Sequence, residues 1–347
     1  MKCFKEICPV KHLKKTGMKK NLQKYGLIYC MIWLLTGFLL SCLMPENLFT
    51  HFYLGVGVLF TLFALKKLNF KINSQEIIDL NSLEDFCKNR SELESYLSEN
   101  FAWRYIKMSC DNQNENLQKS YQQFVNEIMP NASVFDDAWN KKVIESPFVN
   151  ELTETGFPVM LRGMKKAIEI FREENIPLFT ELQNLETNYG ALTGALMVTI
   201  KGEEKTLQQA GALLESTDRV EREEVYQTMV QKRLTIKNEL NDLYTSLIEK
   251  RHQVALNAGF ENYRDYAFAS LGRFDYGPAE CFEFHEAVAE TVVPLLNEAA
   301  AKRKEEMGLD ALKPFDKAVD PLGRGPLKPF ETGEELLTKT ITYKPKK

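Results

Sequence analysis

The sequence has 347 residues, of which 44% are hydrophobic and 27% charged, so it has enough apolar material for the cores of two or three globular domains. The formal net charge of −4 gives no general attraction to nucleic acid, and we expect no nucleic-acid partner. Its seven cysteines are scattered and lack CxxC spacing, which argues against a disulfide framework or a cysteine zinc site and is typical of a reducing compartment.

The chain begins with a basic tail at residues 1–25, which holds eight lysines and one acidic residue. Residues 26–66 contain two apolar runs, 26–44 and 48–65, and Lys66 and Lys67 close the second run. A membrane-spanning helix needs about 20 apolar residues, so the two runs predict a pair of transmembrane helices. Because lysines flank both outer ends, we expect a membrane location with the globular part in the cytoplasm.

Other interpretations of this region stay open. Met18 and two lysines followed by an apolar run resemble a signal peptide, and residues 39–42 loosely resemble a lipoprotein cleavage site. Leu40 is larger than such sites prefer, and a second apolar run follows at once, so we favour the membrane hairpin. A fusion or a misplaced start within residues 1 to about 70 is a further alternative.

Residues 67–214 are predicted to form a helical domain. Ser82 and Ser91 begin cap-like segments, and a helix is expected from Ser91 to about Cys110. Its expected buried residues are Leu93, Tyr96, Leu97, Trp103 and Ile106. Further helices are expected over about 115–129 and 156–174 and from Ile176 onward. The run 195–200 is the best strand candidate, and residues 205–207 could return as its partner after a turn.

Residues 216–307 are predicted to form two long helices joined by a short one. Ser216, Thr217 and Asp218 give a helix start, and Gly259 suits the left-handed cap that ends the first long helix. A short helix over 262–270 follows. Pro278 starts the second long helix, which Pro294 is expected to kink. Such an arrangement needs further helices to cover it.

Several segments resemble oligoendopeptidase F, of the thimet oligopeptidase-type zinc metallopeptidase family. The resemblance rests on segments that follow one another in the same order: 172–179, 206–211, 216–219, 251–266, 271–276, 318–321 and 326–330. It extends from about Asn73 to about Thr340. It implies a mostly helical, zinc-dependent peptidase that cuts oligopeptides inside a deep channel.

The chain departs from this family in its histidines. The family binds zinc on a helix with H-E-x-x-H, where two histidines share one face and the glutamate acts on the metal-bound water. The four histidines here are never four residues apart, and Ala289 stands where a second histidine would follow His285. In the family the zinc motif lies beyond the matched segment. We therefore predict no catalytic, cofactor-binding or metal-binding residues in this chain, with zinc belonging to the intact family.

The predicted fold class is mostly α: the helical N-terminal and partial catalytic region of an oligopeptidase with one short β-hairpin, preceded by a two-helix membrane hairpin. The predicted domains are 1–25, 26–66, 67–214 and 215–347, the last being a truncated front part of the catalytic domain. The expected function is that of a truncated metalloendopeptidase, inactive alone, with an exposed apolar stripe where the missing helices would pack. Expected partners are oligopeptides, the membrane and a complementary C-terminal fragment. The alternative is a membrane-anchored, non-catalytic peptide-binding or scaffold protein.

Four groups of polar or aromatic residues need an interpretation. His285 and Glu286, near Glu283 and Glu290, could be a degenerate metal site, but a catalytic zinc needs three protein ligands, so a partly exposed helix face is favoured. His252 is interpreted as a packing or helix-terminus residue. The charged runs 219–224 and 302–304 are interpreted as solvated faces, with a substrate channel as the alternative. The last group is interpreted as core packing, with a channel wall as the alternative: Tyr263, Tyr266, Phe268, Phe274 and Tyr276.

Overall fold

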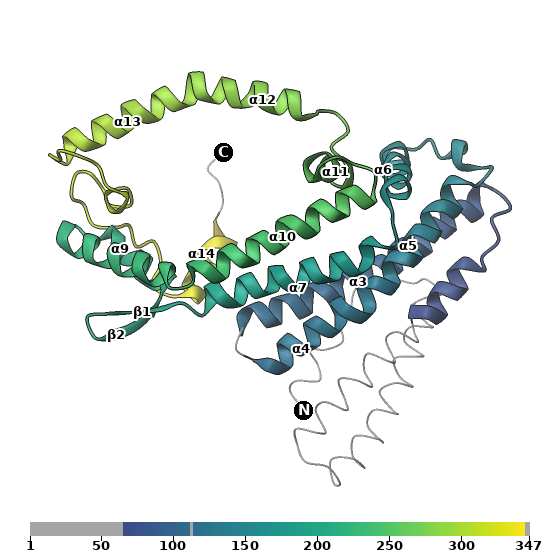
Figure 1. Cartoon of the computed structure of the whole chain (residues 1–347), viewed down its shortest axis with the longest axis horizontal. Coiled ribbons are helices and arrows are strands. Elements are labelled where there is room, and N and C mark those ends of the chain that lie inside the picture. Colours follow the sequence, from purple (N-terminus) through teal and green to yellow (C-terminus); the bar gives the residue numbers. More distant parts are fainter. Residues whose placement is uncertain (1–64, 112–113, 344–347) are drawn as a thin grey trace, which may run out of the picture. The chain divides into compact units, whose positions relative to one another are not determined.

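The computed structural model describes residues 65–111 and 114–343, and it shows a mostly helical protein with one pair of antiparallel strands (Figure 1). The chain divides into two compact units. The first unit contains the residues up to Asn184 together with Val254–Tyr266, and the second contains Leu185–Gln253 and Ala267–Lys347. The mostly helical class with one short β-hairpin is as predicted.

The first unit is built from helices around a main apolar core and a smaller apolar cluster of Met108, Tyr121 and Val125. The elements that lie wholly within this unit are α3 (Leu80–Cys110), α4 (Glu115–Gln123), the π-helical turn η2 (Phe124–Ile128), α5 (Met129–Ile144), the short η3 (Val149–Glu151) and α6 (Phe157–Ile170). Phe86, Trp139 and Val143 are almost fully buried in the main core. Asp79 caps the start of α3: its carboxylate accepts a hydrogen bond from the Ser82 N–H at 2.7 Å, while the Ser82 hydroxyl accepts one from the Asp79 N–H at 3.0 Å.

The predicted membrane hairpin requires a correction. In residues 65–111 and 114–343, none of the helices combines the length and the apolar character that crossing a membrane requires. The predicted spans at 26–66 lie outside the described residues except for their last two positions. Residues 65–73 are helical, and Leu65, Leu68 and Ile72 pack into the core of the first unit. The end of the second apolar run therefore serves protein packing, and neither the membrane hairpin nor the membrane location is supported.

The buried face of α3 also differs from the prediction. Helix α3 is continuous through Ser91 and buries Leu83, Phe86, Leu93 and Met108. Three side chains that were expected in the core are instead exposed: Tyr96, Trp103 and Ile106. The observed face includes two arginines that an apolar pattern overlooks, because the Arg90 guanidinium lies over the Trp139 ring and the Arg104 guanidinium over the Phe124 ring.

The second unit contains the β-hairpin. Strands β1 (Met197–Ile200) and β2 (Glu203–Thr206) pair antiparallel, with Ile200 opposite Glu203. Lys201 and Gly202 form the turn with φ of 53° and 81°, which is the backbone twist that two-residue hairpins favour. Val198 and Ile200 point into a small core with Val225 and Met229. The strand prediction is thus confirmed, with boundaries shifted by two residues at its start.

The first predicted long helix is divided in two. It consists of α9 (Arg219–Leu234) and α10 (Lys237–Asn257), which follow α8 (Leu207–Ala212) and the single turn η4 (Leu213–Glu215). At the break, the N–H groups of Thr235 and Ile236 donate to carbonyls only three residues back, at 3.2 and 3.3 Å. The Thr235 hydroxyl also donates to the Lys232 carbonyl at 2.7 Å, so the side chain competes with the regular helical bond.

The remaining helices follow the predicted order. Gly259 (φ 85°) ends α10, and α11 (Tyr263–Ser270) is the expected short helix. The second long helix consists of α12 (Pro278–Ala287), the π-helical turn η5 (Val288–Val292) and α13 (Val293–Glu306). The expected distortion at Pro294 thus takes the form of a π-turn just before it, because proline has no N–H to donate to the preceding turn. The chain ends with η6 (Pro314–Asp316) and α14 (Gly333–Thr342), while α7 (Asn175–Gly194) precedes the hairpin.

Candidate functional site

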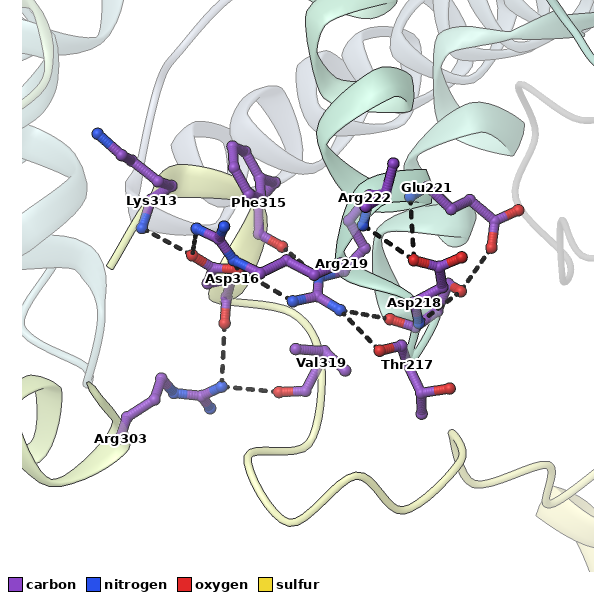
Figure 2. A network of polar contacts seen from close by, with 12 residues as sticks. Thr217, Asp218, Arg219, Glu221, Arg222, Arg303, Lys313, Phe315, Asp316 and Val319 are labelled. Atoms are coloured by element: carbon purple, nitrogen blue, oxygen red, sulfur yellow. Dashed lines mark hydrogen bonds and ion pairs between the residues drawn. The ribbon is translucent and has the colours of Figure 1, made fainter. Parts of the chain in front are cut away.

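A network of buried polar contacts joins α9, α13 and η6 in the second unit (Figure 2). Asp316 is its centre, and the Asp316 side chain is fully buried. The Oδ1 atom of Asp316 accepts from Arg219 Nε at 3.1 Å and from Arg222 Nη2 at 3.0 Å. Its Oδ2 atom accepts from Arg219 Nη2 at 3.1 Å and from the Lys313 N–H at 2.9 Å. Each carboxylate oxygen thus has two donors.

The guanidinium of Arg222 is satisfied in the same way. Its Nε donates to the Phe315 carbonyl at 3.0 Å, and its Nη1 donates to the Ser216 and Thr217 carbonyls at 2.9 and 3.3 Å. The Ser216 and Thr217 carbonyls lie on the segment just before α9. Arg303, near the end of α13, donates from Nη1 to the Val319 carbonyl at 2.7 Å (Figure 2). The three arginines therefore hold residues 313–319 against two helices.

Aromatic contacts and electrostatics reinforce this network. The Arg219 guanidinium lies 5.1 Å from the Phe315 ring centroid, and the Tyr226 ring lies 5.8 Å from Phe315. Burial by itself raises the pKa of Asp316, but the hydrogen bonds from Arg219, the Lys313 N–H and Arg222 outweigh it and lower the pKa below its usual value. Asp316 therefore stays ionised at neutral pH.

The chemistry of this network is structural. A carboxylate has about four positions at which it accepts hydrogen bonds, and all of those of Asp316 are occupied. The carboxylate has no free position for a metal ion or a substrate proton. We call this group, Arg219, Arg222, Arg303 and Asp316, the arginine clamp.

The arginine clamp corrects the interpretation of residues 219–224 as a solvated face. Arg222 is only 2% exposed, and Glu221 pairs with Lys201 across 2.6 Å, while Glu223 and Glu224 are exposed as expected. In the basic run 302–304, Arg303 is half-buried in the clamp and its two lysine neighbours are exposed. Arg219 and Arg222 lie three residues apart on α9, but nothing in their local sequence marks Asp316 as their partner.

The two histidines that the structure describes, His252 and His285, do not form a site. His285 and Glu286 are exposed on α12, and so are Glu283 and Glu290. The His285 ring lies 6.3 Å from the rings of Phe282 and Phe284. His252 is exposed on α10. In the part of the chain that the structure describes, no three or more His, Cys, Asp or Glu residues are grouped so that they could hold a metal ion.

The predicted aromatic cluster falls into two groups, one in each unit. In the first unit, Tyr266 is buried against Phe260 and Tyr263, with ring centroids 5.7 and 5.8 Å apart, and burial raises the pKa of Tyr266 to about 12. In the second unit, Phe268 and Tyr276 lie 6.0 Å apart, and the Arg273 guanidinium lies 5.0 Å from the Phe268 ring. The first group is core packing, as expected, whereas Tyr276 and Arg273 are exposed.

Two hollows of the first unit carry no catalytic arrangement either. The larger, about 770 Å³, lies between residues 73–78 and 138–147, where Lys142 Nζ donates to the Asn73 and Gln75 carbonyls at 2.6 and 2.8 Å. The smaller, about 340 Å³, is lined by Arg90, Glu94 and Asn140 among others. Arg90 pairs with Glu94 and donates to Asn140 at 2.7 Å, so the charged groups of this hollow bind each other.

Comparison with known protein families gives two matches in chain order. Residues 66–171 match the Peptidase M3 N-terminal domain, and residues 212–339 match Peptidase family M3. Together the two ranges cover more than half of the chain. A search of curated proteins gives no match.

Solved structures share this fold at low sequence identity. A putative oligoendopeptidase F from Bacillus anthracis str. Ames is 18% identical with a TM-score of 0.75, and the match covers 80% of this chain and 52% of that chain. PZ peptidase A with inhibitor 2 is 21% identical with a TM-score of 0.70, and the match covers 74% of this chain and 47% of that chain. Oligoendopeptidase-F from Enterococcus faecium is 16% identical with a TM-score of 0.60, and the match covers 80% of this chain and 56% of that chain. The chain thus spans about half the length of the structures that it matches.

Proposed function

The chain belongs to peptidase family M3, and we propose that residues 67–214 form its N-terminal domain and residues 215–347 the front part of its catalytic domain. The ordered pair of family matches supports this division, because the first match ends at residue 171 and the second begins at residue 212. The proposed boundary at Leu214 falls in η4, just before α9.

The reaction proposed for the complete enzyme is hydrolysis of internal bonds in oligopeptides. Zinc is the metal that the family resemblance implies, but the residues present do not fit it. The 347 residues contain no H-E-x-x-H, and among the described residues no three or more His, Cys, Asp or Glu side chains are grouped so that they could hold a metal ion. His285 and Glu286 lie on an exposed helix face without a third ligand. We therefore assign no catalytic step to residues of this chain, and hydrolysis would require residues outside these 347.

The part proposed for this chain is to form one side of the catalytic domain. The arginine clamp supports this role, because its hydrogen bonds attach residues 313–319 to α9 and α13. Elements that are held in place position functional groups more accurately than mobile loops do. A segment whose buried carboxylate has four hydrogen-bond donors is held in place in this way. The clamp thus acts on the shape of the domain and takes no part in chemistry.

A peptidase assay of the purified full chain tests this proposal. The substrate is a mixture of quenched fluorescent oligopeptides, with zinc added, and PZ peptidase A serves as the positive control. We expect no cleavage above the buffer control from a sample that unfolds cooperatively. Cleavage by the chain alone that a chelator abolishes would overturn the proposal. A scaffold that only holds peptides would bind the same substrates without cleaving them, and fluorescence anisotropy would detect that binding.

A further inference from the structure

The long helix α12–η5–α13 in the second unit has apolar side chains that the described structure leaves uncovered. Six of them are exposed: Phe282, Phe284, Val292, Val293, Leu295 and Leu296. Phe284 is 67% and Leu296 is 62% exposed. Single exposed apolar side chains are normal, but a run of six along one helix is a feature of interaction surfaces.

Two of the exposed residues of α13, Val293 and Leu296, belong to a face that is already used for packing. Val293, Leu296, Ala300 and Arg303 follow one another at spacings of three and four, so they lie on one side of the helix. At the far end of this side, Arg303 is half-buried and donates to the Asp316 and Val319 carbonyls at 3.3 and 2.7 Å. The same side is exposed at Leu296, two turns earlier. The packing surface is therefore covered at one end only.

The geometry points to this face of α12–η5–α13 as the docking surface for the remaining part of an M3 catalytic domain, carried on polypeptide outside these 347 residues. This inference rests on the proposed function. Two observations select this occupant. The helix lies inside the segment that matches Peptidase family M3, and the solved structures with this fold are about twice as long as the matched part. The M3 fold thus has elements beyond those described here that can cover the face.

The chemistry of the face agrees with such an occupant. Of the four residues that define it, Val293, Leu296 and Ala300 are apolar, and the charged one is Arg303, which the clamp already binds. A core-forming helix from the same fold offers matching apolar side chains, whereas a nucleic acid or a charged peptide would leave its charges unpaired. Burial of each large apolar side chain would then favour association.

Cysteine labelling tests the inference in the full chain. The probe is the C-terminal part of the Bacillus anthracis oligoendopeptidase F, co-expressed and purified with the chain. Apolar cores tolerate extensive substitution when the volume is kept, so a shared fold permits this pairing. Chelator is present throughout, so binding is measured without catalysis and its failure is distinct from failure of the proposed function. The variants are Leu296→Cys on the face and Ala301→Cys on the opposite side as the matched control. Labelling is read at each introduced cysteine by peptide mass spectrometry, because the chain has seven cysteines of its own.

We expect a 1:1 complex by light scattering, with labelling of Leu296→Cys at least tenfold slower in the complex than in the chain alone. Labelling of Ala301→Cys should change less than twofold. In a second pair of variants, Leu296→Asp should raise the dissociation constant of the complex at least tenfold, whereas Ala301→Asp should change it less than twofold. The absence of a complex would overturn the inference. So would slow labelling of Leu296→Cys in the monomeric chain alone, which would mean that another part of the chain covers the face. Protection only in a homodimer would overturn it in favour of a second copy.

Discussion

Arg222 and Asp316 form an ion pair in which both side chains are buried. The Nη2–Oδ1 distance is 3.0 Å, and the two side chains are 2% and 0% exposed. The pair joins the first turns of α9 to η6, which lies 94 positions further along the chain. A buried charge is tolerated only when it is paired and hydrogen-bonded, so each member depends on the other.

Replacement of Asp316 by asparagine should therefore destabilise the protein severely. The amide has nearly the shape of the carboxylate, but it leaves the buried Arg222 charge without its counter-charge, which costs about 3–5 kcal/mol. Urea unfolding of the full chain measures this loss. Asp320→Asn is the matched control, because Asp320 pairs with the exposed Arg324 and the change should cost less than about 1 kcal/mol. Equal losses for the two variants would contradict the role given to the clamp.

The contribution of Asp316 should also depend on pH. Its pKa in the folded protein lies below the usual value of 3.8, so its stabilising effect is fully present above that value and is lost as the pH falls through the folded pKa. Other carboxylates titrate in the same range, so the informative quantity is the difference between the wild type and Asp316→Asn. That difference should be constant from pH 7 to pH 5 and shrink below pH 4. A difference that grows as the pH falls would show that the sign is wrong.

Asp136 should behave in the opposite way. Burial, helped by the nearby Glu94, raises its pKa from 3.8 to about 6, although Arg90 opposes the shift. The folded state then favours the protonated carboxyl, so stability is full below pH 3.8 and is lost as the pH rises through about 6. Asp136→Asn should stabilise the protein by about 1–2 kcal/mol at pH 7.5 and have little effect at pH 4. Asp85→Asn, at an exposed position of α3, is the control, and stabilisation by both variants would refute the assignment.

Two glycines of the second unit should respond oppositely to alanine. Gly202 has a φ of 81° in the hairpin turn, where a Cβ meets no atom but the backbone conformation is strained, so Gly202→Ala should cost about 1 kcal/mol. Gly190 lies within α7 and also has open space around its Cβ position, so Gly190→Ala should gain about 0.5–1 kcal/mol. Thermal unfolding of the two variants decides this, and a loss of stability on Gly190→Ala would mean that α7 is not a regular helix at that position.

Local signals in the sequence predicted the parts of the fold that depend on local chemistry. Gly259 ends α10 in a left-handed conformation, and the strand at 197–200 turns back at Lys201 and Gly202. These positions depend on backbone preferences that a few neighbouring residues determine. The break at Thr235 was missed, because no proline or glycine marks it in the sequence. Its signs are hydrogen bonds of the folded chain, among them the bond from the Thr235 hydroxyl to the Lys232 carbonyl.

Long-range pairing and the role of an apolar run could not be predicted in this way. Arg222 looked like one member of a charged, solvated run, and only the folded chain brings Asp316 to it. Trp103 fitted an apolar helical pattern but is half exposed, because Arg90 and Arg104 occupy the packed face of α3 in its place. Leu65 fitted the end of a membrane span, but it packs with Leu68 into a protein core. Apolar spacing thus favours burial without ensuring it, and it does not indicate what a buried residue packs against.

The metal content of the purified full chain tests the central claim most directly, namely that these residues belong to an M3 peptidase but do not themselves form its zinc site. After the protein is desalted from zinc-containing buffer, its zinc is measured by mass spectrometry alongside carbonic anhydrase, a zinc enzyme, as a positive control. Because a catalytic zinc needs three protein ligands and the four histidines are never four residues apart, we expect far less than one zinc per chain. One zinc per chain that is lost on His285→Ala would contradict the account.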